Sequence, residues 1–176
     1  MENWTVRAAK TEDLAAIGGI YAAARHYMAS HGNPTQWGRT DPPPALLEED
    51  VARQRLYVLE ESGRLCGVFA FLLGEDPTYA RIEDGSWAGD GSAPYGTIHR
   101  LAGDGSRRGV FARCVAFCRR QAGELRADTH ADNHTMQHLL EREGFQRRGI
   151  IHVANGTPRI AYQLRCDPPA PPSGDL

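Results

Sequence analysis

The chain has 176 residues, of which 41% are hydrophobic and 24% are charged, and its formal net charge is −2. This composition is that of an ordinary globular domain, long enough to bury a sizeable core. The small net charge argues against general binding to nucleic acid or to a membrane surface. No apolar run approaches a membrane span, and the first ten residues lack the apolar core of a secretory signal.

The four cysteines do not have the spacing of paired metal ligands. Cys114 and Cys118 lie four residues apart within an apolar stripe of a predicted helix. We therefore expect thiols that serve packing in a reducing cytoplasm.

The first half of the chain predicts a strand, two helices and a hairpin. Leu14, Ile17 and Tyr21 recur at spacings of three and four, which indicates one buried face of a helix that follows Thr11. A proline-rich loop over 33–44 precedes the second helix. The predicted elements are a strand at 6–9, helices from 11 to about 32 and at 45–54, and strands at 56–60 and 65–73.

The second half alternates strands with shorter helices after a long segment, 74–94, that is rich in glycine, aspartate and serine. Loops of that length inside a domain are usually functional or mobile. The predicted elements are a strand at 95–102, a glycine-rich turn at 103–109, a helix at 110–121, a strand at 124–129, a short helix from Asn133 to Gly144, and strands at 150–153 and 159–164 joined through Asn155-Gly156.

The resulting order, β-α-α-β-β-β-α-β-α-β-β, predicts an α/β protein with a mixed, mostly antiparallel sheet and helices on both faces. We expect a single domain over residues 1–166. The proline-rich tail over 167–176 has little to bury and is expected to lie outside that domain.

The segment NHTMQHLLEREGF, residues 133–145, follows the strand ELRADT. A strand, a short helix that begins with asparagine, and a closing Gly-Phe resemble the second acyl-CoA motif of the GCN5-related N-acetyltransferase (GNAT) family. The element order over about residues 5–165 is also similar to that family's fold. The segments GEDPTYARIEDGSW, YGTIHRLA, DTHADN and GTPRIAYQ resemble a group of small bacterial acetyltransferases of unassigned substrate.

This resemblance implies an acyl-CoA-dependent N-acetyltransferase that acts in the cytoplasm with acetyl-CoA as co-substrate. It implies direct transfer to an acceptor amine, without an acyl-enzyme. A primary amine on a small molecule is the default acceptor, with a protein N-terminus or lysine behind it. The resemblance leaves a homodimer open, and neither nucleic acid nor membrane is an expected partner.

A glycine-rich turn before a helix N-terminus offers backbone N–H groups to a phosphate. In the family's register Ser106, Gly109 and Phe111 occupy the three motif positions, and only Gly109 matches; a shifted register would use Arg108. The resemblance makes strand 95–102 the counterpart of the family strand whose main chain pairs with pantetheine. It implies that backbone N–H groups near Leu101 face the thioester carbonyl and stabilise its oxyanion. Asn133 matches the family asparagine beside the thiol, although a helix cap explains it nearly as well. The predicted cofactor-binding residues are Arg100, Leu101, Ala102, Ser106, Arg107, Arg108, Gly109, Val110 and Asn133.

Leu140 occupies the position where many members carry the tyrosine that protonates the departing thiolate, and leucine cannot donate a proton. His130 and Tyr95 are the candidates for that acid, unless the thiolate leaves into water. His99 and Glu83 are the candidates for the general base, although a strand histidine is more often packed than catalytic.

An acceptor pocket for a cationic amine is predicted from Trp37, Tyr79, Asp84 and Trp87, although loop aromatics often only seal the edge of a core. His134 and His138 share a helix face with His130 just before it, but no zinc motif accompanies them, and no metal is expected.

Two other classes of protein stay open. A non-catalytic acyl-CoA-binding module is favoured by Phe111 and Leu140, the two departures from the family pattern. A structural partner protein would show no response to CoA. Release of thiol from acetyl-CoA in the presence of amines separates these classes from an enzyme.

Overall fold

The computed structural model describes residues 3–166 and contains the predicted elements in the predicted order, with two short 3₁₀ helices added at Thr11–Asp13 and Pro77–Tyr79. The predicted tail, 167–176, lies outside the described residues. Within the described part, no helix has the length and apolar character to cross a bilayer. The strands are Trp4–Ala8 (β1), Leu56–Glu61 (β2), Arg64–Leu73 (β3), Gly96–Gly103 (β4), Glu124–Thr129 (β5), Gln146–His152 (β6) and Pro158–Arg165 (β7), and the helices are Leu14–Ser30 (α1), Pro44–Ala52 (α2), Val110–Arg119 (α3) and His134–Arg142 (α4).

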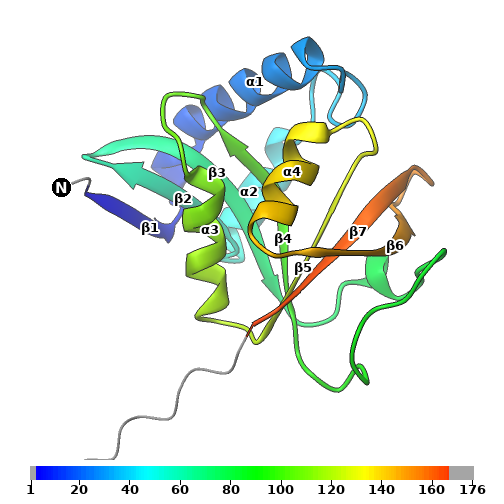
Figure 1. Cartoon of the computed structure of the whole chain (residues 1–176). Helices are drawn as coiled ribbons and strands as arrows, with labels where there is room; N and C mark the ends of the chain where they lie inside the picture. Colours follow the sequence, from blue (N-terminus) through cyan, green and yellow to red (C-terminus); the bar gives the residue numbers. More distant parts are fainter. Residues whose placement is uncertain (1–2, 167–176) are drawn as a thin grey trace, which may run out of the picture.

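The seven strands form one sheet in the order β1-β2-β3-β4-β5-β7-β6 (Figure 1). Every neighbouring pair is antiparallel except β4 and β5, which run parallel. The predicted fold class, a mixed and mostly antiparallel sheet, is therefore confirmed. Short turns join β2 to β3 and β6 to β7, and the crossover through α3 makes the single parallel contact.

Helices cover both faces of the sheet, as predicted. Phe111, Cys114 and Cys118 of α3 and Leu140 of α4 are buried against one face, which is the front face in Figure 1. Ile17 and other residues of α1 pack with α2 against the opposite face of β2 to β4. Cys114 and Cys118 are fully buried, so both thiols serve packing as expected.

The parallel contact between β4 and β5 is short. Only Gly96 with Leu125 and Thr97 with Arg126 are in register, although β4 continues to Gly103 and β5 to Thr129. Beyond these two pairs β4 stays bonded to β3, and β5 stays bonded to β7. The two central strands therefore separate at their carboxyl ends, where backbone groups on the facing edges are not used by the other strand.

A bulge interrupts β4 close to that point of separation. Ala70 of β3 faces His99, but Val68 faces Ala102, so two β4 residues oppose one β3 residue. Arg100, inside the bulge, has φ +51°, a left-handed conformation that is uncommon for a residue with a side chain. The bulge bends the strand at its centre and redirects the backbone there.

The long segment between β3 and β4 is packed on the face of the sheet opposite α4. Tyr79 and Tyr95 are buried there with Ile151 and Ala161 of β6 and β7. The guanidinium of Arg126 lies 4.1 Å from the ring centre of Trp87 and 3.8 Å from that of Tyr95. This segment is thus an ordered layer that takes the place of a helix over β5 to β7.

Strand β6 differs most from its prediction, which placed it at 150–153. The strand begins at Gln146, four residues earlier than predicted. Its first half, Gln146 to Arg148, is polar because β6 lies at the sheet edge, where the first two residues are exposed. An edge strand does not need an apolar pattern along its whole length, so the sequence pattern does not reveal the polar part of this strand. Ile150 also exchanges two backbone hydrogen bonds of 2.8 Å with Glu83 of the long segment.

We expect Gly96→Ala to destabilise the protein by about 1–3 kcal/mol because a side chain there overpacks the core. A Cβ at Gly96 would lie 2.3 Å from Cζ of Phe71, at the first of the two β4–β5 pairs. Urea unfolding measures the change. Gly123→Ala is the matched control, since a Cβ at Gly123 meets nothing within 4 Å. Equal stability of the two variants would contradict this account.

Candidate active site

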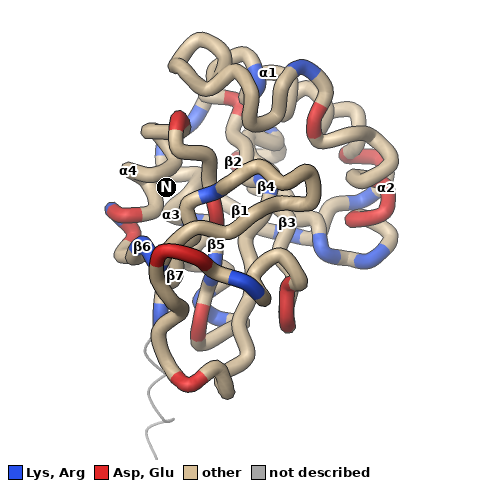
Figure 2. The backbone as a smooth tube through the Cα atoms, turned by 90° about the vertical axis from the view of Figure 1, so that its right-hand side faces the viewer, with Lys and Arg blue, Asp and Glu red and all other residues tan. Residues whose placement is uncertain are grey.

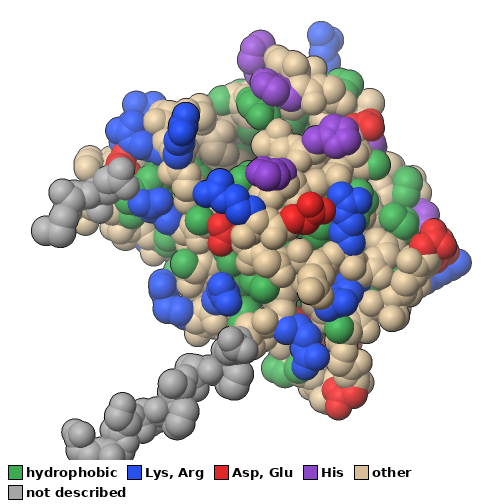
Figure 3. Space-filling view, viewed as in Figure 1, with side chains coloured by type: hydrophobic (Ala, Val, Ile, Leu, Met, Phe, Trp, Pro, Cys, Tyr) green, Lys and Arg blue, Asp and Glu red, His purple; other side chains and the backbone are tan. Residues whose placement is uncertain are grey.

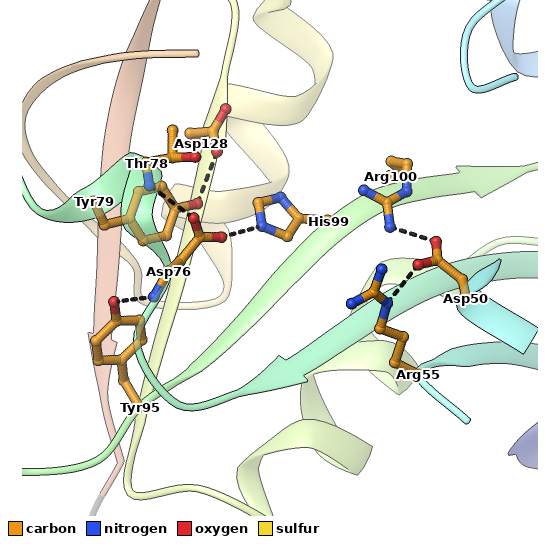
Figure 4. A network of polar contacts seen from close by, with 9 residues as sticks. All are labelled: Asp50, Arg55, Asp76, Thr78, Tyr79, Tyr95, His99, Arg100 and Asp128. Carbon is orange, nitrogen blue, oxygen red and sulfur yellow. Dashed lines mark hydrogen bonds and ion pairs between the residues drawn. The ribbon is translucent and has the colours of Figure 1, made fainter. Parts of the chain in front are cut away.

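Two polar networks meet at the bulge of β4 (Figure 4). His99 contacts Asp76, which lies just before the first turn of the long segment, and the next residue, Arg100, contacts Asp50 of α2. Consecutive strand side chains normally point to opposite faces of a sheet. Because of the bulge, the side chains of His99 and Arg100 both reach partners in the layer that lies on the face of the sheet opposite α3 and α4.

His99 and Asp76 form a hydrogen-bonded pair in which Nε2 lies 2.7 Å from Oδ2. Their side chains are 21% and 11% exposed, so the pair is shielded without being sealed from solvent. The hydrogen bond from His99 lowers the pKa of Asp76 to about 2, which keeps the carboxylate ionised at neutral pH. An ionised acceptor fixes the proton of a neutral imidazole on Nε2, and the lone pair is then left on Nδ1.

Asp76 is itself held in place by the segment that carries it. Its Oδ1 accepts a 2.9 Å hydrogen bond from the backbone of Thr78, and its own backbone N–H donates to the hydroxyl of Tyr95 at 2.8 Å. Tyr95, which the sequence offered as a candidate proton donor to the thiolate, is buried, and its hydroxyl helps to hold Asp76 in place. Its proton-donor role stays a prediction.

Tyr79 and Trp87, two of the predicted acceptor-binding residues, pack inside the long segment. The Tyr79 hydroxyl donates to Oδ2 of Asp128 on β5 at 2.7 Å, and burial raises the pKa of this tyrosine well above its ordinary value. Trp87 Nε1 donates to the carbonyl of Tyr79 at 3.0 Å, and the ring centres of Tyr79 and His99 are 6.1 Å apart. The structure gives both aromatics a packing role behind His99.

On the other side of the bulge, Asp50 is fully buried between two arginines. Its Oδ1 accepts from Nε of Arg55 and its Oδ2 from a terminal nitrogen of Arg100, each at 2.5 Å. The carbonyl of Arg100 accepts a 2.7 Å hydrogen bond from the hydroxyl of Tyr21 on α1. Trp37 packs edge-to-face on Tyr21 with 5.6 Å between ring centres, which brings this predicted acceptor residue to the bulge.

The N-terminus of α3 has no side-chain cap. Gly109 occupies the N-cap position with φ +79°, a conformation suited to glycine, and it has no side chain with which to cap the first turn. Phe111 points into the core, where its ring lies 6.3 Å from that of Phe145, so it does not fill the turn. Free N–H groups at a helix N-terminus attract anions, which suits the predicted phosphate seat at Val110.

Two of the three predicted phosphate-binding side chains in the turn before α3 already bond to carboxylates of this protein. The Ser106 hydroxyl donates to Asp104 at 2.5 Å, and Nε of Arg107 pairs with Glu61 of β2. Arg108 is exposed and makes no hydrogen bond or ion pair with another residue of the described range. Of the three side chains, Arg108 is the one left to meet a phosphate.

Asn133 caps α4 by accepting a 3.1 Å hydrogen bond from the backbone of Met136. Its Nδ2 donates to Gln36 of the loop between α1 and α2, also at 3.1 Å. Capping is therefore present, and cofactor contact by Asn133 stays a prediction. Nδ1 of His130 accepts from the backbone of Asp132 at 3.0 Å, so the neutral ring carries its proton on Nε2. Leu140 is fully buried in the core.

Two predicted residues lie elsewhere in their segment. Glu83 forms an exposed ion pair with Arg81 at 2.6 Å and joins β6 through its backbone, and Asp84 is exposed. No contact brings either side chain to His99 within the described residues. Sequence reasoning also missed Asp50 and Asp76. Asp50 follows Leu47 at helical spacing on the buried side of α2, and a charge on such a face was the available signal.

Histidine side chains gather over α1 and α4 on the face shown in Figure 3. Among residues 3–166 no group of three or more histidine, cysteine, aspartate or glutamate residues is placed to hold a metal ion. The seam between the two helices is instead joined by the hydroxyl groups of Tyr27 and Thr135, whose oxygen atoms are 3.0 Å apart.

A hollow of about 590 Å³ lies between α1 and the turn that joins β2 to β3, away from His99. Apart from Glu12, its charged lining residues pair with one another: Arg7 contacts Asp13 at 2.8 Å and Glu60 at 3.1 Å, and Arg64 contacts Asp104 at 3.3 Å. Figure 2 shows that acidic and basic residues also alternate in space along much of the rest of the chain. Because those charges are mutually satisfied, this hollow is a poor candidate for the reacting site.

Comparison with solved structures identifies the class of fold. A GNAT-family acetyltransferase from Streptococcus agalactiae matches with a TM-score of 0.80 and 29% identity, over 94% of this chain and 96% of that one. A Staphylococcus aureus protein assigned as an acetyltransferase matches with a TM-score of 0.64 and 26% identity, over 92% and 98%. A Salmonella typhimurium protein assigned as an acetyltransferase, solved with its cofactor acetyl-CoA, has a TM-score of 0.57 and 20% identity, over 98% and 99%.

No protein-family model and no curated protein matches the sequence. The structural neighbours are nonetheless GNAT-family acetyltransferases over nearly the whole chain, and the resemblance inferred from the sequence is confirmed. This chain has the GNAT fold, and the neighbours support an acyl-CoA-dependent acetyltransferase.

Asn133→Ala should lower the free energy of unfolding by about 1 kcal/mol, because α4 loses its N-cap. Asn133→Ser is the matched control, since serine also caps helices but is too short to reproduce the contact with Gln36. Urea unfolding of the two variants compares cap and bridge. If serine is as destabilising as alanine, the bridge to Gln36 and not the cap is the stabilising contact.

Proposed function

We propose that this protein is an N-acetyltransferase that transfers the acetyl group of acetyl-CoA directly to a primary amine, most simply that of a small molecule. The observation that carries the proposal is the separation of β4 from β5 after Thr97, with the uncapped N-terminus of α3 on one side and the His99–Asp76 pair on the other. Acetyl-CoA between the strands would place its diphosphate at the N-terminus of α3 and its thioester near the His99–Asp76 pair.

The binding part of the proposal rests on the backbone. Since β5 does not pair with β4 beyond Thr97, the edge of β4 is open to the amides of pantetheine, which can add to it like a further strand. The diphosphate would sit at Val110 on the free N–H groups of α3, and Arg108 would supply a positive charge. The solved Salmonella neighbour, which holds acetyl-CoA, has the same fold.

His99 is the proposed general base. With Nε2–H held by ionised Asp76, its Nδ1 lone pair accepts the proton from the acceptor ammonium, directly or through water. The amine nitrogen then bonds to the acetyl carbon, the carbon–sulfur bond breaks, and its electron pair leaves on sulfur. The second proton of the former ammonium passes from the new amide nitrogen to water. No covalent bond to the protein is needed. Asp76 orients the imidazole of His99 and offsets the positive charge that His99 gains when it accepts the proton.

His130 is the proposed donor of a proton to the thiolate. Its Nε2 carries the proton in the neutral ring, and its side chain, 19% exposed, lies in the loop between β5 and α4. Leu140 cannot serve, because it is aliphatic and buried. The buried thiols of Cys114 and Cys118 accord with a reducing cytoplasm as the site of action.

Thiol release from acetyl-CoA across a panel of primary amines tests the proposal. An enzyme releases CoA in an amine-dependent manner. Thermal stabilisation by CoA without any turnover would instead identify a non-catalytic binding module, and no stabilisation by CoA would refute acyl-CoA binding altogether.

His99→Gln should lower kcat by about 10²–10⁴-fold and remove the acidic limb of the pH–rate profile, because the base that must be deprotonated is gone. Asp76→Asn should lower kcat in the same direction, since an amide N–H facing Nε2 favours the wrong tautomer. His152→Gln is the control, because His152 is an exposed residue at the end of β6. An acidic limb that persists in His99→Gln would assign the base to another residue.

Arg108→Gln should raise the KM for acetyl-CoA several-fold, and the increase should shrink at high salt because the contact is an exposed charge pair. Arg119→Gln is the matched control, an exposed arginine at the opposite end of α3. Steady-state kinetics at two ionic strengths measure both variants. An equal change in the two would show a general effect of charge and not a phosphate contact.

A further inference from the structure

Tyr21 and Asp50 are not needed by the proposed chemistry, yet both are buried and both bond to the same residue of β4. Tyr21 is 1% exposed and Asp50 is 0% exposed. One holds the main-chain carbonyl of Arg100 and the other holds its guanidinium. Two separate helices, α1 and α2, therefore fix one residue of the bulge.

Arg100 adopts a left-handed conformation, φ +51°, that glycine would adopt at less cost. Glycine has no side chain with which to reach α2, whereas Arg100 forms the 2.5 Å contact with Asp50. Arg55 occupies the second oxygen of Asp50, so the carboxylate is fixed from both sides. The bulge is thus held in an unfavourable conformation by interactions at its side chain.

The carbonyl contact sets the direction of a neighbouring N–H group. In a trans peptide unit the C=O of one residue and the N–H of the next point in opposite directions within one plane. Because the Tyr21 hydroxyl holds the Arg100 carbonyl toward α1 at 2.7 Å, the N–H of Leu101 points away from α1. From the sequence, a backbone N–H near Leu101 is expected to face the thioester carbonyl.

We propose that Tyr21 and Asp50 are positioning residues that lock the β4 bulge so that the Leu101 N–H polarises the acetyl carbonyl of the bound thioester. This proposal rests on the proposed function and deepens it. Burial raises the pKa of Tyr21 above its ordinary value, so the hydroxyl stays a proton donor over the working pH range. The lock prearranges the oxyanion donor before any acceptor arrives.

The carbonyl stretch of bound acetyl-CoA labelled with ¹³C at the acetyl carbonyl tests the lock by difference infrared spectroscopy, which requires no acceptor. Hydrogen bonding weakens the C=O bond, so binding to the native protein should shift the band to lower frequency. Tyr21→Phe keeps the ring and removes only the hydroxyl. It should still bind acetyl-CoA, as calorimetry can verify, and lose most of the shift.

Tyr27→Phe is the matched control, because it removes a hydroxyl from the same helix, one that contacts Thr135 of α4. It should retain the full shift. Asp50→Asn is the second variant, expected to lose the shift with a fold that circular dichroism can verify; Tyr21→Phe decides the matter if Asp50→Asn does not fold. A full shift in Tyr21→Phe overturns the lock alone, whereas absence of acetyl-CoA binding by the native protein overturns the proposed function as well.

Discussion

Two residue pairs join β4 to β5, and the rest of the site depends on where that pairing stops. Each strand keeps its outer neighbour, β3 for β4 and β7 for β5, so the sheet stays continuous while its centre opens. Backbone groups on the facing edges would be costly if buried without partners. In the proposed function, the amides of pantetheine satisfy the groups on β4, and the opening then serves binding.

Buried charges in this protein arrange backbone more than they add stability. Removing one partner of a buried ion pair is costly, but a buried pair often contributes little net stability compared with apolar residues. Asp50 and Asp76 each hold a β4 residue, and Glu124 with Arg126 and Gln163 holds the long segment against β5 and β7. In each case the charges fix a conformation that hydrophobic packing, which is non-directional, would leave free.

The order of strands and helices could be predicted because buried apolar residues follow the period of each element, as Ile17 and Tyr21 do in α1. The position of His99 on the central strand could be predicted for the same reason. Its partner could not, because Asp76 lies in a polar segment whose composition is that of a solvated loop, and its role arises from contacts across 23 residues of sequence. The bulge at Arg100 likewise depends on tertiary contacts with Tyr21 and Asp50, which no local pattern records.

The long segment does more than cover β5 to β7. Within four residues it forms a hydrogen bond to each of the two central strands: Asp76 bonds to His99 on β4, and Tyr79 bonds to Asp128 on β5. Separating the two strands further would break these bonds, so the segment ties β4 to β5 across the opening. The link between the two central strands and the orientation of the imidazole thus have a common origin in one short stretch of chain.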